Sequence, residues 1–132
     1  MKALAKAIYN QAVTLGLVVH WGTAPADQAM PYLVLRLQPV LMPQYTTEDV
    51  FTEDRVIRFT VFAASMEAVM GYMQDIEKAF VAQDLTVETG HVLVVLKQAE
   101  DCFLDPERDP SAGEVWLGVL DMAITCQRKP GD

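Results

Sequence analysis

The most constraining feature of the sequence is an abrupt change of hydrophobic periodicity at Ser65. Over residues 55–64 apolar residues alternate with polar ones, which predicts a strand with one buried face, central in its sheet. From residue 66 to about 83 apolar residues recur every three or four positions, which predicts a helix with one apolar stripe. Ser65 stands where the N-cap of this helix is expected. The stripe comprises Met66, Val69, Met70, Met73, Ile76 and Phe80.

Three methionines in the stripe leave two interpretations open. Met-rich surfaces sometimes serve as adaptable grooves for a partner. A stripe at helical spacing is more often core that packs on a sheet. We therefore expect this helix to cover the sheet that the preceding strand helps to build.

The N-terminal third of the sequence predicts a helix followed by two strands. Residues 2–15 contain no Gly or Pro, and their apolar residues recur at helical spacing. Gly16 follows where a left-handed C-terminal cap is expected, and residues 17–21 form a short β-rich run. Residues 22–31 are predicted to be a loop because they contain two prolines and a glycine. Three leucines alternate within residues 32–40, which predicts a strand with one buried face.

Two acidic segments and three further strands are predicted in the remainder. Residues 42–54 indicate a long arm or hairpin loop, and residues 100–110, with two prolines and five acids, indicate a solvated loop. Residues 85–88 and 91–99 are predicted to form a hairpin through a turn at Thr89-Gly90. Residues 114–126 predict a last strand that is largely covered on both faces.

These elements predict one α+β domain that spans residues 1–132. Their order is a helix, three strands, a helix and three strands, and short connections favour antiparallel neighbours. The expected architecture is a mostly antiparallel sheet with two helices packed on one face.

Composition restricts the classes of partner. Apolar residues make up 52% of the chain, a high share for a small domain, so some of them are expected to be covered only in an oligomer. The net charge of -8 repels phosphates, and the basic residues form no cluster, which argues against tight binding of nucleic acid. No apolar run is long enough to cross a bilayer and the start does not resemble a signal peptide, so we expect no membrane partner and a cytosolic origin.

The sequence offers no motif for catalysis, metal binding or cofactor binding. Ser65 is accounted for as a helix cap, and Ser111 lies in a proline-rich turn. The thiols and imidazoles belong to Cys102, Cys126, His20 and His91. A Cys–His pair is conceivable in space, but two free structural thiols and two ordinary strand histidines are the simpler interpretation. No paired metal-ligand spacing and no phosphate-binding glycine loop is present. We therefore predict a chain that is not an enzyme and has no catalytic residue, no metal and no cofactor.

Apolar residues within the two acidic segments are the candidate interaction residues. Long irregular loops in compact domains tend to be functional or disordered. Apolar side chains on such loops either anchor a partner or fold back on the domain. The candidate interface residues are Tyr45, Glu48, Asp49, Val50, Phe51, Phe103 and Leu104.

The arrangement resembles the tail terminator, or tail completion, proteins of siphophages and related prophages. The resemblance covers nearly the whole chain and depends on the order and spacing of its elements. It is carried by Gly16-Leu17-Val18-Val19, Ala24-Pro25, Met30-Pro31-Tyr32-Leu33-Val34, the strand Arg58-Phe59-Thr60-Val61-Phe62-Ala63 and the helix start Met66-Glu67-Ala68-Val69. Residues 100–112 follow no pattern of the family.

The resemblance implies a structural role in a virion assembled in the bacterial host cytoplasm. Such proteins form a ring, typically of six subunits, that binds the end of the tail tube, stops its polymerisation and offers a surface to the head–tail connector protein. The implied partners are copies of the chain, the tail tube protein and the connector, and DNA passes through the lumen without specific binding. In the family the loop at residues 42–54 corresponds to arm-like extensions. Another head–tail connector or neck component, or a small ligand-binding module, remains as an alternative.

Overall fold

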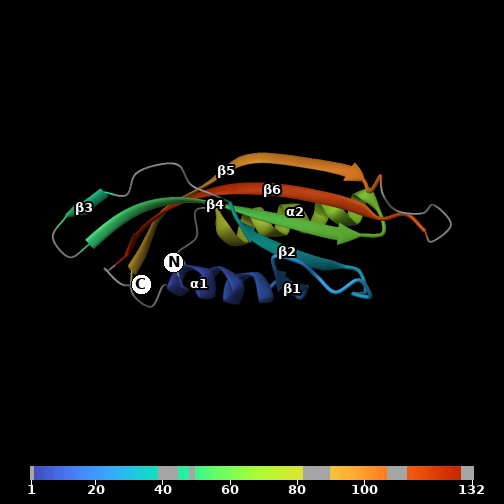
Figure 1. Cartoon of the computed structure of the whole chain (residues 1–132). Coiled ribbons are helices and arrows are strands. Elements are labelled where there is room, and N and C mark those ends of the chain that lie inside the picture. Colours follow the sequence, from blue (N-terminus) through green and yellow to red (C-terminus); the bar gives the residue numbers. More distant parts are fainter. Residues whose placement is uncertain (1, 39–44, 48–49, 82–89, 107–112, 129–132) are drawn as a thin grey trace.

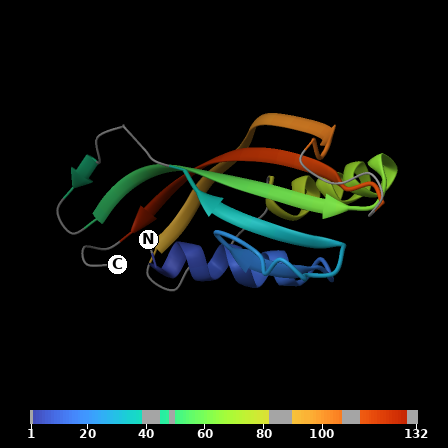
Figure 2. The same cartoon turned by 45° about the vertical axis from the view of Figure 1, so that its right-hand side comes forward.

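The computed structural model describes residues 2–38, 45–47, 50–81, 90–106 and 113–128. Two helices and six strands follow one another as α1 Lys2–Val13, β1 Val18–Trp21, β2 Tyr32–Leu37, β3 Tyr45–Thr47, β4 Val50–Ala63, α2 Met66–Phe80, β5 Gly90–Leu104 and β6 Trp116–Arg128. The strands form one sheet in the order β1-β2-β4-β6-β5, and the short β3 pairs with β4 beside this path. Both helices lie on the same face of the sheet (Figures 1 and 2). The predicted α+β class and its two-layer architecture are confirmed.

Strand β4 is the centre of the sheet, as its alternation predicts. It pairs antiparallel with β2 on one side and with β6 on the other, and the pairing with β6 runs from Phe51 opposite Arg128 to Ala63 opposite Trp116. The side chains of Ile57, Phe59 and Val61 point toward the helices and are fully buried. Apolar residues at every second position therefore place β4 against the core along its second half.

Helix α2 begins at the predicted position. The hydroxyl of Ser65 accepts a hydrogen bond of 3.2 Å from the backbone N–H of Ala68, which satisfies one donor of the first turn. The residues of α2 buried against the sheet are Val69, Met73, Ile76 and Phe80. Met66 and Met70, predicted as part of the same stripe, are instead 43% and 55% exposed. The buried stripe is thus narrower than the apolar stripe of the sequence.

Helix α1 covers the other half of the same sheet face. Leu4, Ile8 and Ala12 are buried in the core, and the Gln11 side-chain amide donates a 2.9 Å hydrogen bond to the Ala79 carbonyl of α2. Gly16 ends this segment with a φ of 80°, a left-handed conformation that glycine adopts without strain. The chain then enters β1, which pairs parallel with β2; all other strand pairs are antiparallel.

The strand ends differ from the predicted ones. The region predicted as a long arm or hairpin loop contains the β3–β4 hairpin, and β4 starts at Val50, so residues 50–54 are strand. The region predicted as a solvated loop from residue 100 is strand up to Leu104, because β6 supplies hydrogen-bond partners to β5 along its whole length. The predicted strand at residues 85–88 and its turn lie outside the described residues. No helix in the described part of the chain has the length and apolarity to span a membrane.

Strand β6 has one buried face only. Leu120, Met122 and Ile124 are fully buried under the helices, whereas Leu117, Val119 and Ala123 on the opposite face are only half-buried. The prediction that both faces of this strand are largely covered is therefore too strong, because both helices pack on the same side. The opposite side is an open sheet face.

Candidate protein-interaction surfaces

The two predicted groups of interface residues lie at opposite ends of the sheet. Tyr45 is in β3 and Val50 and Phe51 are in β4, while Glu48 and Asp49 lie outside the described residues. Phe103 and Leu104 form the end of β5. Phe51 of β4 and Gly90 of β5 both lie opposite Arg128 of β6, and Ala63 of β4 and Leu104 of β5 both lie opposite Trp116. The two groups are therefore separated by the twelve positions from Phe51 to Ala63, about 40 Å. One compact partner site cannot include both groups.

Phe103 and Leu104 do not fold back on the domain, which is one of the two arrangements that the sequence left open, and they are strand residues. Their exposed fractions are 37% and 46%, and they pair with Leu117 and Trp116 of β6. The regular backbone of β5 holds these two side chains in fixed directions, which a flexible loop would not do. They therefore remain candidate contacts, on a more rigid support than the sequence predicted.

All exposed large apolar side chains of the described residues lie along two sides of the molecule. The first set, which we call the β1 edge, lies on α1 and β1 and comprises Tyr9, Val13, Val18 and Trp21. The second set, which we call the β5 edge, lies on α2 and β5 and comprises Met66, Met70, Leu96, Phe103 and Leu104. None lies on β2, on residues 54–63 of β4 or on β6. Within the described residues β1 and β5 are the outermost strands, so both edges also present unpaired backbone groups.

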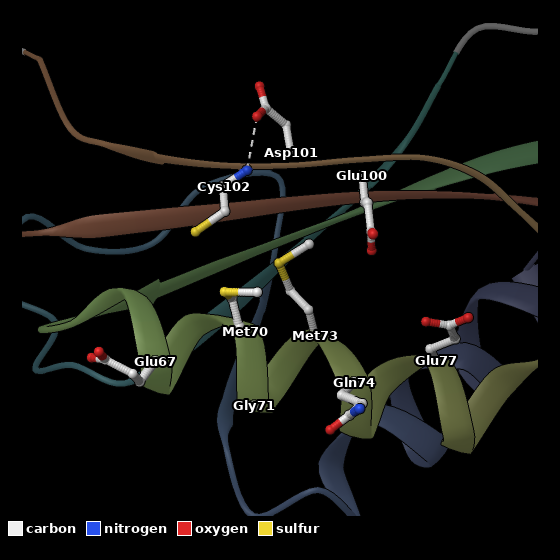
Figure 3. Close-up of a pocket in the computed structure, with 9 residues that line it drawn as sticks. All are labelled: Glu67, Met70, Gly71, Met73, Gln74, Glu77, Glu100, Asp101 and Cys102. Atoms are coloured by element: carbon white, nitrogen blue, oxygen red, sulfur yellow. Dashed lines mark hydrogen bonds between the residues drawn. The ribbon is translucent and has the colours of Figure 1, made fainter.

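A groove of 730 Å³ runs between α2 and β5 at the β5 edge (Figure 3). The residues that line it are Glu67, Met70, Gly71, Met73, Gln74, Glu77, Glu100, Asp101 and Cys102. Figure 3 shows the sulfur atoms of Met70, Met73 and Cys102 in the space between helix and strand, with the carboxylates of Glu67 and Glu77 on the helix and that of Glu100 on the strand. A polarisable apolar floor with an acidic rim suits a protein segment that carries apolar and basic side chains.

The charges of this groove are only partly compensated. Lys97 lies 3.5 Å from a carboxylate oxygen of Glu77 and 3.7 Å from one of Glu100, so it connects the helix to the strand. Both ion pairs are exposed and contribute little to stability. One lysine against the carboxylates of Glu67, Glu77 and Glu100 leaves the groove acidic.

Cys102 in this groove is not an activated nucleophile. Burial raises the pKa of its thiol, and the negative charge of Asp101 raises it further, so the protonated form is favoured. His20 lies on β1, at the edge of the sheet opposite to β5, and its Nε2 is 2.7 Å from Oε1 of Gln28. These two residues therefore do not form the Cys–His pair that the sequence left open.

The second cysteine lies apart from the first. Cys126 is buried in the core, opposite Val92, whereas Cys102 lies opposite Gly118, eight positions or about 27 Å along β6. Both thiols are free, and this separation is too large for a disulfide between them. The side chain of His91 and the whole of Ser111 lie outside the described residues. Among the residues that the structure does describe, no group of three His, Cys, Asp or Glu side chains has the geometry to hold a metal ion.

The open sheet face is organised by cross-strand pairs. Arg58 and Asp121 form a two-bond ion pair at 2.9 and 3.0 Å, and the hydrogen bond to Asp121 raises the pKa of Arg58, which therefore stays charged. The rings of Tyr32 and Phe62 stack at 4.6 Å. A shallow concavity of 410 Å³ lies between these two pairs. Arg58 and Asp121 thus satisfy each other on this face, which also carries the exposed side chains of Leu96 and Phe103, opposite Ala123 and Leu117.

Comparison with known proteins identifies the fold. No protein-family model and no curated protein matches the sequence. Among solved structures, a chain described as "Virion of native gene transfer agent (GTA) particle" superposes with a TM-score of 0.61. The match covers 91% of this chain and 92% of the other, at 16% sequence identity. The whole domain thus shares its fold with a chain from a virion.

Proposed function

We propose that this chain is a tail terminator, a structural protein that forms a ring at the end of a phage tail tube. In this proposal the ring stops polymerisation of the tube and provides the surface that joins tail to head. The chain itself carries out no catalysis and works in the virion after assembly in the bacterial host cytoplasm. Its partners are further copies of the chain, the tail tube protein and the head–tail connector protein, and DNA passes through the ring.

The observation that carries the proposal is the fold match to a chain of the gene transfer agent virion. The match extends over nearly the full length of both chains. It agrees with the element order by which the sequence resembles tail terminators. A match at 16% identity concerns the fold, and the assignment to the tail end depends on the resemblance.

The distribution of apolar surface supports an assembling protein. Nine exposed large apolar side chains lie along the two edges, and among the described strands β1 and β5 have a neighbour on one side only. The acidic groove at the β5 edge contains a protonated thiol and carboxylates on an open rim, which suits protein contact better than bond chemistry.

The test is addition of the purified chain to polymerising tail tube protein from the same phage or prophage. Electron microscopy should show rings at tube ends, and tube length should stop increasing at about one ring per tube end. A matched control is the chain heated above its melting temperature and cooled. Tubes that elongate unchanged, with no density at their ends, would contradict the proposal. Retention of a portal-side adaptor instead of the tube protein in a pull-down would assign the chain to the connector side.

A further inference from the structure

Acidic and basic residues are distributed unequally along the chain. Residues 1–47 contain three basic residues and one acidic residue, whereas residues 48–132 contain seven basic and seventeen acidic residues. The first segment has a net charge of +2 and the second of -10. Because the N-terminal segment builds α1, β1 and β2, this asymmetry becomes a difference between the two sides of the sheet.

At the β1 edge the described charges are mainly positive. Lys6 is exposed on α1, and Arg36 is exposed on the open face of β2, the strand next to β1. Asp27, in the loop between β1 and β2, is the one acidic residue of this region. Tyr9, Val13, Val18 and Trp21 supply the apolar part of the edge.

At the β5 edge the charges are mainly negative. Glu67, Glu77 and Glu100 bring three carboxylates to the groove between α2 and β5, Asp101 carries its carboxylate on the other side of β5 (Figure 3), and Lys97 partly neutralises Glu77 and Glu100. Met70 is exposed on α2 beside the groove, and Leu96 is exposed on the open face of β5, opposite Ala123. The two edges are therefore alike in apolar character and opposite in charge.

From this complementarity we infer that the β1 edge of one copy docks onto the β5 edge of the next copy. The inference rests on the proposed function and names the contact by which the ring is built. Pairing of two β5 edges would bring two acidic grooves together, and pairing of two β1 edges would leave every acidic edge uncovered. Head-to-tail docking covers both apolar edges of each copy, and a closed ring leaves none exposed.

Trp21 is the strongest anchor in this contact. Large aromatic side chains dominate the energetics of protein interfaces, and Trp21 is the largest exposed side chain of the β1 edge. The contact brings the net positive charge of the N-terminal segment, which builds the β1 edge, toward the acidic β5 edge. The contact should accordingly weaken as the salt concentration rises.

Two substitutions test the contact, one on each edge. Trp21→Glu places an acid on the basic edge, and Leu96→Lys places a base on the acidic edge. Both side chains are exposed, at 37% and 59%, so circular dichroism spectra and melting temperatures should remain those of the native chain. Asp75→Asn is the control, because it changes the net charge by one unit, as Leu96→Lys does, on an exposed residue of α2 outside the groove.

Self-association is measured by sedimentation equilibrium or mass photometry over a range of concentrations. The native chain and Asp75→Asn should associate beyond dimers, while each edge variant alone should associate roughly tenfold or more weakly, as expected for loss of a central interface residue. An equimolar mixture of Trp21→Glu and Leu96→Lys should form heterodimers or larger assemblies, because one variant retains an intact β5 edge and the other an intact β1 edge.

Three results would overturn the inference. They are a native chain that stays monomeric at the highest attainable concentration, an edge variant that still dimerises alone through its other edge, and a mixture that associates no better than its components. Capping of tail tubes is scored separately. If the native chain caps tubes and both edge variants associate and cap as it does, the docking mode is refuted and the proposed function stands. If the chain associates head to tail but does not cap tubes, the docking mode stands and the proposed function is refuted.

Discussion

Replacing Gly118 by alanine is expected to destabilise the fold, because side chains of α2 pack directly against β6 at this glycine. Gly118 is buried in β6, and a Cβ atom built there would overlap the sulfur of Met73 and a methyl group of Val69. The thioether of Met73 is flexible and can move, but the β-branched side chain of Val69 has few alternative rotamers in a helix. The helix must therefore shift away from the sheet or leave a strained contact.

The magnitude follows from two opposing terms. Adding a methyl group to a well-packed core costs about 1–3 kcal/mol. Alanine also restricts the unfolded chain relative to glycine, which contributes about 0.4–1 kcal/mol of stability where the backbone conformation allows it. Gly118 is not among the glycines with positive φ, so this second term applies. The cost of the overlap should exceed the gain from the unfolded chain, so the free energy of unfolding should fall by roughly 0.5–2 kcal/mol.

Urea unfolding followed by circular dichroism measures the effect. The midpoint for Gly118→Ala should fall while the slope stays unchanged. Gly71→Ala is the control with the opposite expected sign, because Gly71 is an exposed residue of α2 and a Cβ there meets nothing within 4 Å. This control should gain about 0.5–1 kcal/mol from the better helix propensity of alanine.

A double-mutant cycle locates the cause. If Val69 is the obstacle, the loss from Gly118→Ala should be smaller in a Val69→Ala background than in the native background. Equal losses in the two backgrounds would assign the strain to another contact. A Gly118→Ala variant as stable as the native chain would refute the close helix–sheet packing altogether.

Three further outcomes can be checked on the isolated chain. Phe80→Ala should cost about 3–5 kcal/mol in chemical denaturation, since the ring is fully buried and packs 4.9 Å from that of Phe59; a loss below 1 kcal/mol would argue against this packing. Ser65→Ala should cost about 1 kcal/mol by removing the N-cap, and Ser65→Asp should retain most of that stability. Alkylation of Cys102 by iodoacetamide should rise only at a pH above that needed for a cysteine peptide, because its pKa is raised. Because the pKa of Cys102 is higher in the folded than in the unfolded chain, the free energy of unfolding should fall as pH rises from the ordinary thiol pKa toward the raised one. Asp101→Asn should remove the smaller, electrostatic part of the pKa shift, and with it part of the change in alkylation and in stability.

The sequence by itself determined the secondary structure wherever one periodicity persists. Strand β4, the cap at Ser65 and helix α2 lie where alternation, capping chemistry and helical spacing predict them. Gly16 ends the first helical segment for the same kind of local reason. These features depend on the geometry of the backbone within a few residues, which the order of amino acids specifies directly.

Only the tertiary structure decided how far the strands extend and which apolar side chains remain exposed. The acidic residues Glu100 and Asp101 predict a loop, yet β6 pairs with β5 beyond them and keeps the chain extended. Met66 and Met70 continue the apolar stripe of α2 in sequence but lie past the margin of the sheet face that the helix covers. The local residue types favour one secondary structure, whereas strand pairing and side-chain burial depend on segments that are distant in the sequence. The two apolar edges, and the charge difference between them, exist only because the chain order places β1 and β5 on opposite sides of one sheet.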